Sequence, residues 1–235
     1  MYNRIMLKLS GEALGGNGTP LDAEKLHDLA MEIKEVADNG TQIGIVCGGG
    51  NVIRGKFSSQ MKLDRAQADN MGMLATVINS LALQGALETA GAKAVTMSSF
   101  DMPKVCELAN SRKAIEHLEE GKIVLFAGGT GNPFCSTDSA TALRAAEIKA
   151  DVILIAKNGV DGVYTADPKV DPNAKKYDIL TYREMLKNNL QVIDLAAACT
   201  CIESGIEAFV FDMGVSGNIL KAVQQTATGT KLIKE

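Results

Sequence analysis

Short apolar segments alternate with segments of helical periodicity along the chain, and this alternation constrains the fold more than any other feature. Most of the apolar segments are rich in β-branched residues, as central parallel strands are. We expect strands at residues 4–9, 42–47, 93–97, 122–127, 151–156 and 207–211. Helical patterns fall between them, around Leu26–Val36 and at about 65–90, 103–119, 138–149, 194–204 and 217–226. The alternation predicts an α/β fold with a largely parallel sheet and helices on both faces.

The composition is that of an ordinary globular protein. Apolar residues make up 46% of the 235 residues and charged residues 22%, with a net charge of −4. This mild acidity argues against a nucleic-acid partner or an anionic membrane surface, because both attract a basic face. No Pro- or Ser-rich linker divides the chain. Residues 158–180 are polar and turn-rich, and they predict an excursion that carries a hairpin.

The N-terminal segment and the cysteines both favour a cytoplasmic location. Lys8 interrupts the first apolar segment, so residues 1–10 do not form the apolar core of a signal peptide. The five cysteines are odd in number and lack C-x-x-C spacing, and most lie in apolar segments. We expect buried free thiols in a reducing compartment.

The helix expected near residues 71–87 is apolar nearly all round. A helix that packs on one sheet needs only one apolar stripe. The excess indicates a second buried face, either an interface between subunits or deep burial within one subunit.

Three glycine-bearing turns each follow an expected strand. They are Leu9–Ala13, Cys47–Asn51 and Ala127–Pro133. Ligands of open α/β sheets bind at the carboxyl ends of strands, and glycine lets backbone N–H groups approach an anion. The three turns together predict phosphate binding, although any tight strand-to-helix turn favours glycine.

Other motifs for phosphate binding and catalysis are absent. The segment Gly50–Phe57 matches G-x-x-x-x-G-K, but Phe57 stands where a hydroxyl would bind magnesium, so we interpret the match as accidental. There is no G-x-G-x-x-G or G-x-S-x-G motif. His27 and His117 lie among charged residues on expected amphipathic helices, so we expect no histidine acid–base chemistry.

Four charged or polar positions are candidates for contacts with a nucleotide. Strand alternation places Lys8 on the same face as Met6 and Ser10. Lys8 is either a cation for phosphate or a lysine that reaches solvent from a strand end. Arg54 is either an anion clamp or a surface residue, and Asp69 is either a ribose contact or a residue of a helix N-terminal turn. Capping accounts for one residue of the cluster Ser136–Ser139, but not for all four.

Six motifs resemble, in order, those of the bacterial-type uridylate kinases in the amino-acid-kinase superfamily. They cover nearly the whole chain, and GTGNPF followed by S-T-D is particularly specific. The motifs are KLSGEAL (8–14), GGGNVIRG (48–55), DNMGMLAT (69–76), GGTGNPFCSTDSA (128–140), NGVDGVYTADP (158–168) and DLAA (194–197).

The resemblance implies a kinase that transfers the γ-phosphoryl group of ATP to UMP with Mg²⁺, in pyrimidine nucleotide synthesis. It also implies a cytoplasmic homohexamer. The implied fold is a single three-layer αβα sandwich, residues 1–235, with a UMP-binding part at about 1–150 and an ATP-binding part at about 151–235.

The resemblance also assigns site residues, while the ligands of the metal stay unassigned. The implied catalytic residues are Lys8, Arg54, Asp138 and Asp194. The implied ATP contacts are Lys8, Leu9, Ser10, Gly11, Gly50, Arg54, Asn158, Tyr164 and Asp167. The implied UMP contacts are Gly49, Asp69, Thr130, Gly131, Asn132, Pro133, Phe134, Cys135, Ser136 and Thr137. Asp138, Asp161 and Asp194 match acids that organise lysines, loops and the metal.

One segment departs from the family pattern. Many relatives carry a Gly-Phe-Gly-Ile-Asp-like stretch that is associated with activation by GTP. Residues 16–22 here lack the aromatic residue and contain Pro20. The resemblance therefore does not extend GTP activation to this chain.

Two alternative functions stay open at this point. One is a kinase of the same superfamily that acts on a carboxylate or carbamate, which the GTGNPF loop disfavours. The other is a nucleotide-binding protein without catalysis, which the full set of Lys8, Arg54, Asp138 and Asp194 disfavours.

Overall fold

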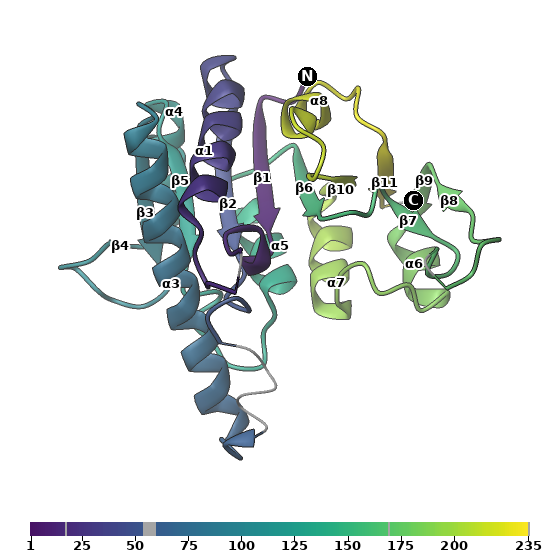
Figure 1. Cartoon of the computed structure of the whole chain (residues 1–235), viewed down its shortest axis with the longest axis horizontal. Coiled ribbons are helices and arrows are strands. Elements are labelled where there is room, and N and C mark those ends of the chain that lie inside the picture. Colours follow the sequence, from purple (N-terminus) through teal and green to yellow (C-terminus); the bar gives the residue numbers. More distant parts are fainter. Residues whose placement is uncertain (17, 54–59, 169, 235) are drawn as a thin grey trace.

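A mainly parallel sheet forms the centre of the computed structural model, which describes residues 1–16, 18–53, 60–168 and 170–234 (Figure 1). Within these residues nine strands pair in the order β4-β3-β5-β2-β1-β6-β10-β11-β9, and only β10 and β11 are antiparallel neighbours. The six expected strands are confirmed, with each end within one residue. They are β1 (Arg4–Leu9), β2 (Gln42–Cys47), β3 (Ala94–Ser98), β5 (Ile123–Ala127), β6 (Val152–Lys157) and β10 (Glu207–Asp212). The others in the sheet are β4 (Glu107–Leu108), β9 (Ile179–Thr181) and β11 (Gly229–Ile233).

Helices cover both faces of this sheet. One face packs against α1 (Ala23–Asp38), α3 (Arg65–Thr89) and α8 (Asn218–Val223). The other packs against α4 (Ser111–Glu119), α5 (Thr137–Glu147), α6 (Tyr182–Lys187) and α7 (Leu195–Ser204). This arrangement confirms the predicted three-layer αβα fold.

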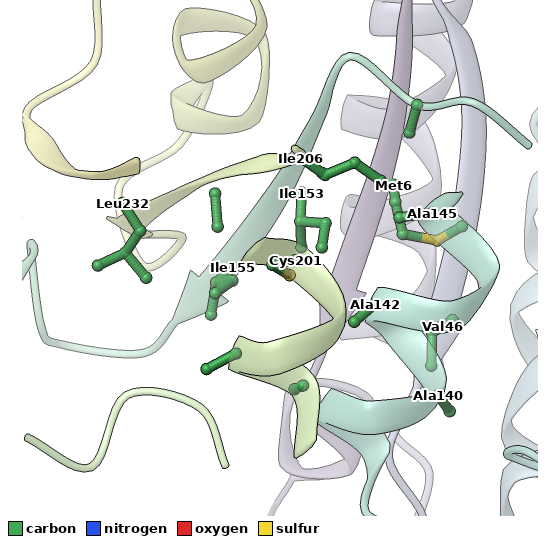
Figure 2. Packing of buried hydrophobic residues seen from close by; sticks show 14 of the residues in the cluster. Met6, Val46, Ala140, Ala142, Ala145, Ile153, Ile155, Cys201, Ile206 and Leu232 are labelled. Atoms are coloured by element: carbon green, nitrogen blue, oxygen red, sulfur yellow. The ribbon is translucent and has the colours of Figure 1, made fainter. Parts of the chain in front are cut away.

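Strand β1 shows how alternation divides the core. Ile5, Leu7 and Leu9 are fully buried against α1, α3 and α8. Met6 points to the other face, where it packs with the α5 and α7 residues shown in Figure 2. Lys8 follows Met6 on that second face, at the carboxyl end of the strand, as the alternation predicts.

The expected helix at 103–119 is wrong in its first half, because α4 begins at Ser111. The side chain of Asn110 accepts a hydrogen bond from the amide of Lys113 (3.1 Å) and caps the helix. The preceding Glu107–Leu108 instead pairs with β3 at the edge of the sheet.

The hairpin predicted within residues 158–180 is confirmed. β7 (Val163–Tyr164) pairs with β8 (Lys176–Tyr177) in an antiparallel manner. Buried Thr230 holds this hairpin, because its hydroxyl accepts from the amide of Val163 (2.8 Å) and donates to the carbonyl of Tyr177. The next segment, Tyr182–Lys187, forms the short helix α6, which the sequence patterns did not predict.

Helix α3 keeps one apolar stripe uncovered. Leu74, Ile78 and Leu81 are 45%, 49% and 36% exposed, although Val77 and Leu83 on the same helix are buried. Deep burial within one subunit is therefore wrong as the explanation for its all-round apolar character. No helix in the described part of the chain has the length and apolarity that a membrane span requires.

A pair of asparagines ties α3 to the turn after β2. Fully buried Asn79 donates its amide to the carbonyl of Gly48 (2.7 Å) and to Oδ1 of Asn51 (2.7 Å). The amide of Asn51 donates back to Asn79 Oδ1 (3.0 Å) and to the carbonyl of Pro20. This network fixes the triple-glycine turn.

We predict that Asn79→Ala destabilises the protein, because it removes the amide that donates to the Gly48 carbonyl and to Oδ1 of Asn51. The cost is about 2–3 kcal/mol, which lowers the midpoint of thermal unfolding by about 5–10 °C. Calorimetry or circular dichroism measures the shift. Asn70→Ala, on the exposed side of the same helix, is the matched control. Equal unfolding midpoints for the two variants would contradict the role of this network.

Candidate functional site

The turns that follow β1, β2 and β5 meet at one edge of the sheet. Because β2 pairs in parallel with β1 and β5, and β1 pairs with β6, the carboxyl ends of these strands are neighbours. The amide of Gly48 donates to the carbonyl of Leu9 (2.9 Å), so the first two turns are in direct contact. The structure thus brings the three predicted glycine turns together.

Glycine is required where the first turn touches the second and where the second touches α3. A Cβ on Gly11 would lie 2.8 Å from the carbonyl oxygen of Gly48, and one on Gly49 would lie 2.5 Å from the carbonyl oxygen of Gly72 in α3. Both distances are too short for any side chain. Two glycines therefore serve backbone packing, while Gly50 has open space around it.

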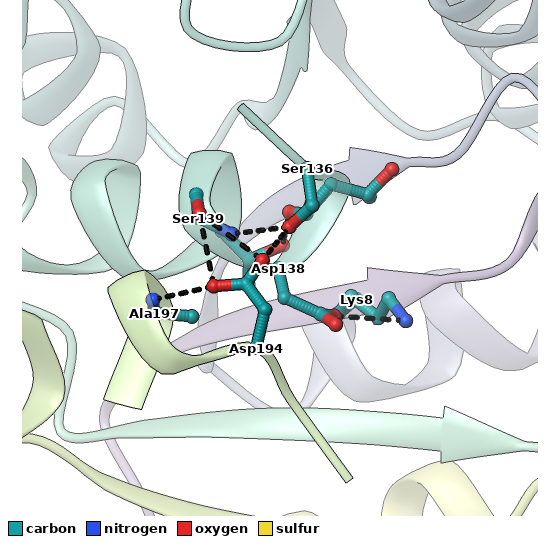
Figure 3. Close-up of polar contacts among 8 residues, drawn as sticks. Lys8, Ser136, Asp138, Ser139, Asp194 and Ala197 are labelled. Carbon is teal, nitrogen blue, oxygen red and sulfur yellow. Dashed lines mark hydrogen bonds and ion pairs between the residues drawn. The ribbon is translucent and has the colours of Figure 1, made fainter. Parts of the chain in front are cut away.

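Lys8 is held against the first turn of α5 (Figure 3). Its Nζ lies 3.1 Å from Oδ1 of Asp138, and the two side chains are only 14% and 21% exposed. Lys8 is therefore not a lysine that reaches solvent from a strand end. The pair places a cation at the point where the glycine turns meet.

Asp194 braces two helices. Its carboxylate accepts hydrogen bonds from the hydroxyls of Ser136 and Ser139, the latter at 3.2 Å, and from the amide of Ala197 (2.8 Å) (Figure 3). It caps α7 and also holds the N-terminus of α5. Ser136 in turn caps α5 through the amide of Ser139.

The loop before α5 lies against α3. The carboxylate of Asp69 accepts from the amide of Phe134 (2.8 Å) and from Nε of Arg65 (3.0 Å). The Arg65 guanidinium lies 5.4 Å from the centre of the Phe134 ring. Asp69 does not cap α3, since that helix begins after Asp64. Asp69 instead holds the loop to the helix.

A cavity of about 630 Å³ lies between this loop, the triple-glycine turn and α3. Six of the predicted UMP and ATP contacts line it: Gly49, Gly50, Asp69, Cys135, Ser136 and Thr137. The other predicted loop residues, Thr130 to Phe134, are not part of its lining. Arg65 and Lys62 also line it, and the sequence patterns did not single out either residue.

A second cavity of about 620 Å³ lies beside the β7–β8 hairpin. Tyr164 and Asp167 line it, together with Lys157 and Gln191. Asn158 instead lines a separate groove of about 960 Å³, between α1 and residues 213–217. The structure therefore brings two of the three predicted adenine-pocket residues into one cavity.

Asp161 stiffens the hairpin next to this second cavity. The Tyr164 hydroxyl donates to Oδ1 of Asp161 (2.6 Å), and Nζ of Lys176 donates to Oδ2 (2.9 Å). The hydrogen bond from Tyr164 and then that from Lys176 lower the pKa of the Asp161 carboxyl below its ordinary value.

The remaining predicted ATP contacts lie at the end of β1, on the turn that follows it, or outside the described residues. Leu9 is fully buried in the core, so only its backbone faces the first turn. Ser10 and Gly11 lie on that turn, where Gly11 begins a short 3₁₀ helix. Arg54 lies outside the described residues.

Among the described residues, no three His, Cys, Asp or Glu side chains gather in a group that could hold a metal ion. The carboxylate of Asp138 has a buried oxygen, Oδ1. This oxygen is in the ion pair with Lys8, but it accepts no well-aligned hydrogen bond within the described part of the chain.

Comparisons with known proteins agree with this geometry. Residues 3–212 match the model of the amino acid kinase family. The crystal structure of UMP kinase from Bacillus anthracis is similar, with a TM-score of 0.96 and 38% identity over 100% of this chain and 97% of that one. UMP kinase from Ureaplasma parvum gives a TM-score of 0.95 and 36% identity, with both chains covered completely. Uridylate kinase from Archaeoglobus fulgidus gives 0.74 and 32%, over 97% of this chain and 99% of that one. With a family match over most of its length and similar solved structures over all of it, the chain belongs to the amino acid kinase family.

Proposed function

We propose that this protein is a UMP kinase that transfers the γ-phosphoryl group of ATP to UMP and releases UDP and ADP. One observation carries the proposal: the partly buried Lys8–Asp138 pair lies where the glycine turns meet. The cavity lined by Asp69 is on the acceptor side, and the cavity lined by Tyr164 and Asp167 is on the donor side. The likeness to UMP kinases over the whole chain supports it.

The reaction needs positioning and positive charge more than it needs a base. The phosphate of UMP has a second pKa of about 6, as other phosphate monoesters do, so it is mainly a dianion at neutral pH. One of its oxygens forms a bond to the γ-phosphorus, the bond from that phosphorus to the β–γ bridging oxygen breaks, and ADP leaves with the electron pair. No proton has to be removed first, and no intermediate forms on the protein.

Lys8 supplies charge at the transfer point. Two polyanions repel each other, and phosphoryl transfer is accelerated chiefly by positioning and by stabilising charge on the equatorial and leaving oxygens. Asp138 holds the ammonium group of Lys8 from the first turn of α5. The amides of the glycine turns are suited to the remaining phosphate oxygens.

The residues of this edge fit a magnesium ion that enters with ATP. Such an ion needs only one or two protein carboxylates besides the phosphates. Asp138 is the residue suited to hold it, because its carboxylate lies at the transfer point and its Oδ1, although paired with Lys8, accepts no aligned hydrogen bond from the described residues. When bound, Mg²⁺ neutralises charge on the β- and γ-phosphates.

The stripe of Leu74, Ile78 and Leu81 supports self-association, and we propose a homohexamer. Apolar side chains that are half exposed at i, i+4 and i+7 on a long helix form the kind of surface that a second copy of the chain covers.

Five free cysteines support a cytoplasmic location, although Cys135 and Cys199 are exposed and not buried as predicted.

We predict that an assay of ADP release gives turnover with UMP, and little or none with glutamate or aspartate. Lys8→Met lowers kcat with UMP by about 100-fold or more, as the loss of one stabilising donor does. Because Lys8→Met alone leaves Asp138 buried without its cation, Lys8→Met/Asp138→Asn is tested beside it. Turnover with glutamate or aspartate but not UMP would overturn the proposed function. Full activity of both Lys8 variants would remove Lys8 from the transfer site.

A second prediction concerns the acceptor cavity. Asp69→Asn raises KM for UMP about tenfold, because a neutral amide replaces a charged acceptor of hydrogen bonds, and it changes KM for ATP little. Initial rates at varied UMP and ATP separate the two effects. Asp64→Asn is the matched control, since Asn also caps a helix. Equal increases in both KM values would place Asp69 outside the acceptor site.

A third prediction concerns assembly. Ile78→Glu puts a charge in the centre of the α3 stripe, so we expect a smaller particle in analytical ultracentrifugation than the wild-type hexamer. Val105→Glu, at a site that is 50% exposed elsewhere, leaves the mass unchanged. A hexamer that survives Ile78→Glu would show that the stripe is not an interface.

A further inference from the structure

Lys157 lies on the same face of the sheet as Lys8 and close to it. In the pairing of β1 with β6, Lys8 is opposite Ile155, and Lys157 comes two residues later in β6. Because alternate residues of a strand share a face, Lys8, Ile155 and Lys157 point to the same side. Ile155 confirms that side, since it packs in the core formed with α5 and α7.

The charge of Lys157 is not balanced by the described residues. Its ammonium group makes no ion pair or hydrogen bond with any of them. Burial lowers the pKa of Lys157, and the charge of Lys8 lowers it further, while Asp138 acts in the opposite direction. Two cations therefore share one carboxylate, and that carboxylate is already 3.1 Å from Lys8.

The acidic neighbour of Lys157 in β10 does not neutralise it. Asp212 is directly opposite Lys157 in the pairing of β6 with β10. Its Oδ1 accepts from the amides of Gly159 (2.9 Å) and Gly214 (2.8 Å), so this oxygen joins two loops. A partly buried cation without a partner is costly unless a ligand supplies the opposite charge.

The position of Lys157 indicates which ligand that is. Lys157 lines the 620 Å³ cavity with Tyr164 and Asp167, the predicted contacts of the adenine nucleotide. The charge of Lys8, in the transfer site, acts on it directly. Lys157 is therefore placed between the donor cavity and the transfer point, where the phosphate chain of a bound nucleotide has to pass.

We propose that Lys157 is a second cationic residue of the transfer site, which contacts the phosphate chain of the ATP donor beside Lys8. The proposal rests on the proposed function. In this proposal Lys157 stabilises the negative charge that stays on ADP when the bond to the bridging oxygen breaks. Lys8 stabilises the negative charge on the γ-phosphoryl group that is transferred. A charged ligand with several phosphates would resolve the repulsion between the two lysines.

The test compares Lys157→Met and Lys157→Arg with the wild type. We expect Lys157→Met to raise KM for ATP and the Kd of ADP about tenfold, as the loss of a charge-assisted contact does, and to leave KM for UMP nearly unchanged. Lys157→Arg keeps the charge and recovers most of the loss. Lys93→Met is the matched control and stays at wild-type values, because Lys93 is exposed at the opposite, amino edge of the sheet, before β3.

Calorimetric titration with ADP in the absence of UMP separates this inference from the proposed function. If the wild type binds ADP but does not phosphorylate UMP, the proposed function fails, and the titration still tests Lys157. Wild-type Kd and KM values for Lys157→Met would overturn the inference. Thermal unfolding checks that Lys157→Met is folded. If Lys157→Met does not fold, Lys157→Gln replaces it, and ADP binding by Lys157→Gln equal to that of the wild type would overturn the inference.

Discussion

The parallel pairing of β1 with β2 on one side and with β6 on the other is the constraint on which the site depends. It brings the turns after these strands to one edge and places Lys8 and Lys157 on one face of the sheet. The first two turns can touch only because Gly11 lacks a side chain beside the Gly48 carbonyl, and Gly49 lets the second turn approach α3 at Gly72. A shift of one residue between these strands would turn Lys8 into the core formed with α1 and α3. The register therefore sets both the core and the chemistry.

The aspartates around this edge have different roles: Asp194 and Asp161 hold structural elements together, and Asp138 pairs with the cation Lys8. Asp194 joins α5 to α7, and Asp161 joins Tyr164 to Lys176 within the hairpin. Both oxygens of each of these two carboxylates accept hydrogen bonds from the protein. Asp138 differs, because its buried Oδ1 faces Lys8 without an aligned donor. A ligand that brings its own cation and several negative charges meets the needs of Asp138 and of the lysines together.

The central strands could be predicted from the sequence because burial on both faces gives continuous apolar runs. The strands β4 and β7 have two residues each, and α6 has six, so no periodicity can develop in them. The glycine turns and the loop before α5 could be predicted because their residues are contiguous. Lys157 and Arg65 could not, since neither lies within a glycine turn or a family motif, whereas Lys8 opens the motif KLSGEAL. The roles of Lys157 and Arg65 depend on neighbouring side chains, and only the folded structure shows which side chains those are.

The acceptor cavity is organised before any ligand enters it. The loop before α5 is held at Phe134 by Asp69 and at Ser136 by Asp194, so its backbone is fixed at two points. Arg65, by contrast, has a side chain that is 66% exposed, and among the described residues its ion pair is with Asp69, while its guanidinium lies over the Phe134 ring. An exposed pair of this kind contributes only about 0.2–1 kcal/mol. If UMP binds Asp69, as the proposed function requires, it competes with Arg65 for that carboxylate, while Asp194 still holds the loop at Ser136. The guanidinium of Arg65 would then be a neighbour for the negative charge of the acceptor.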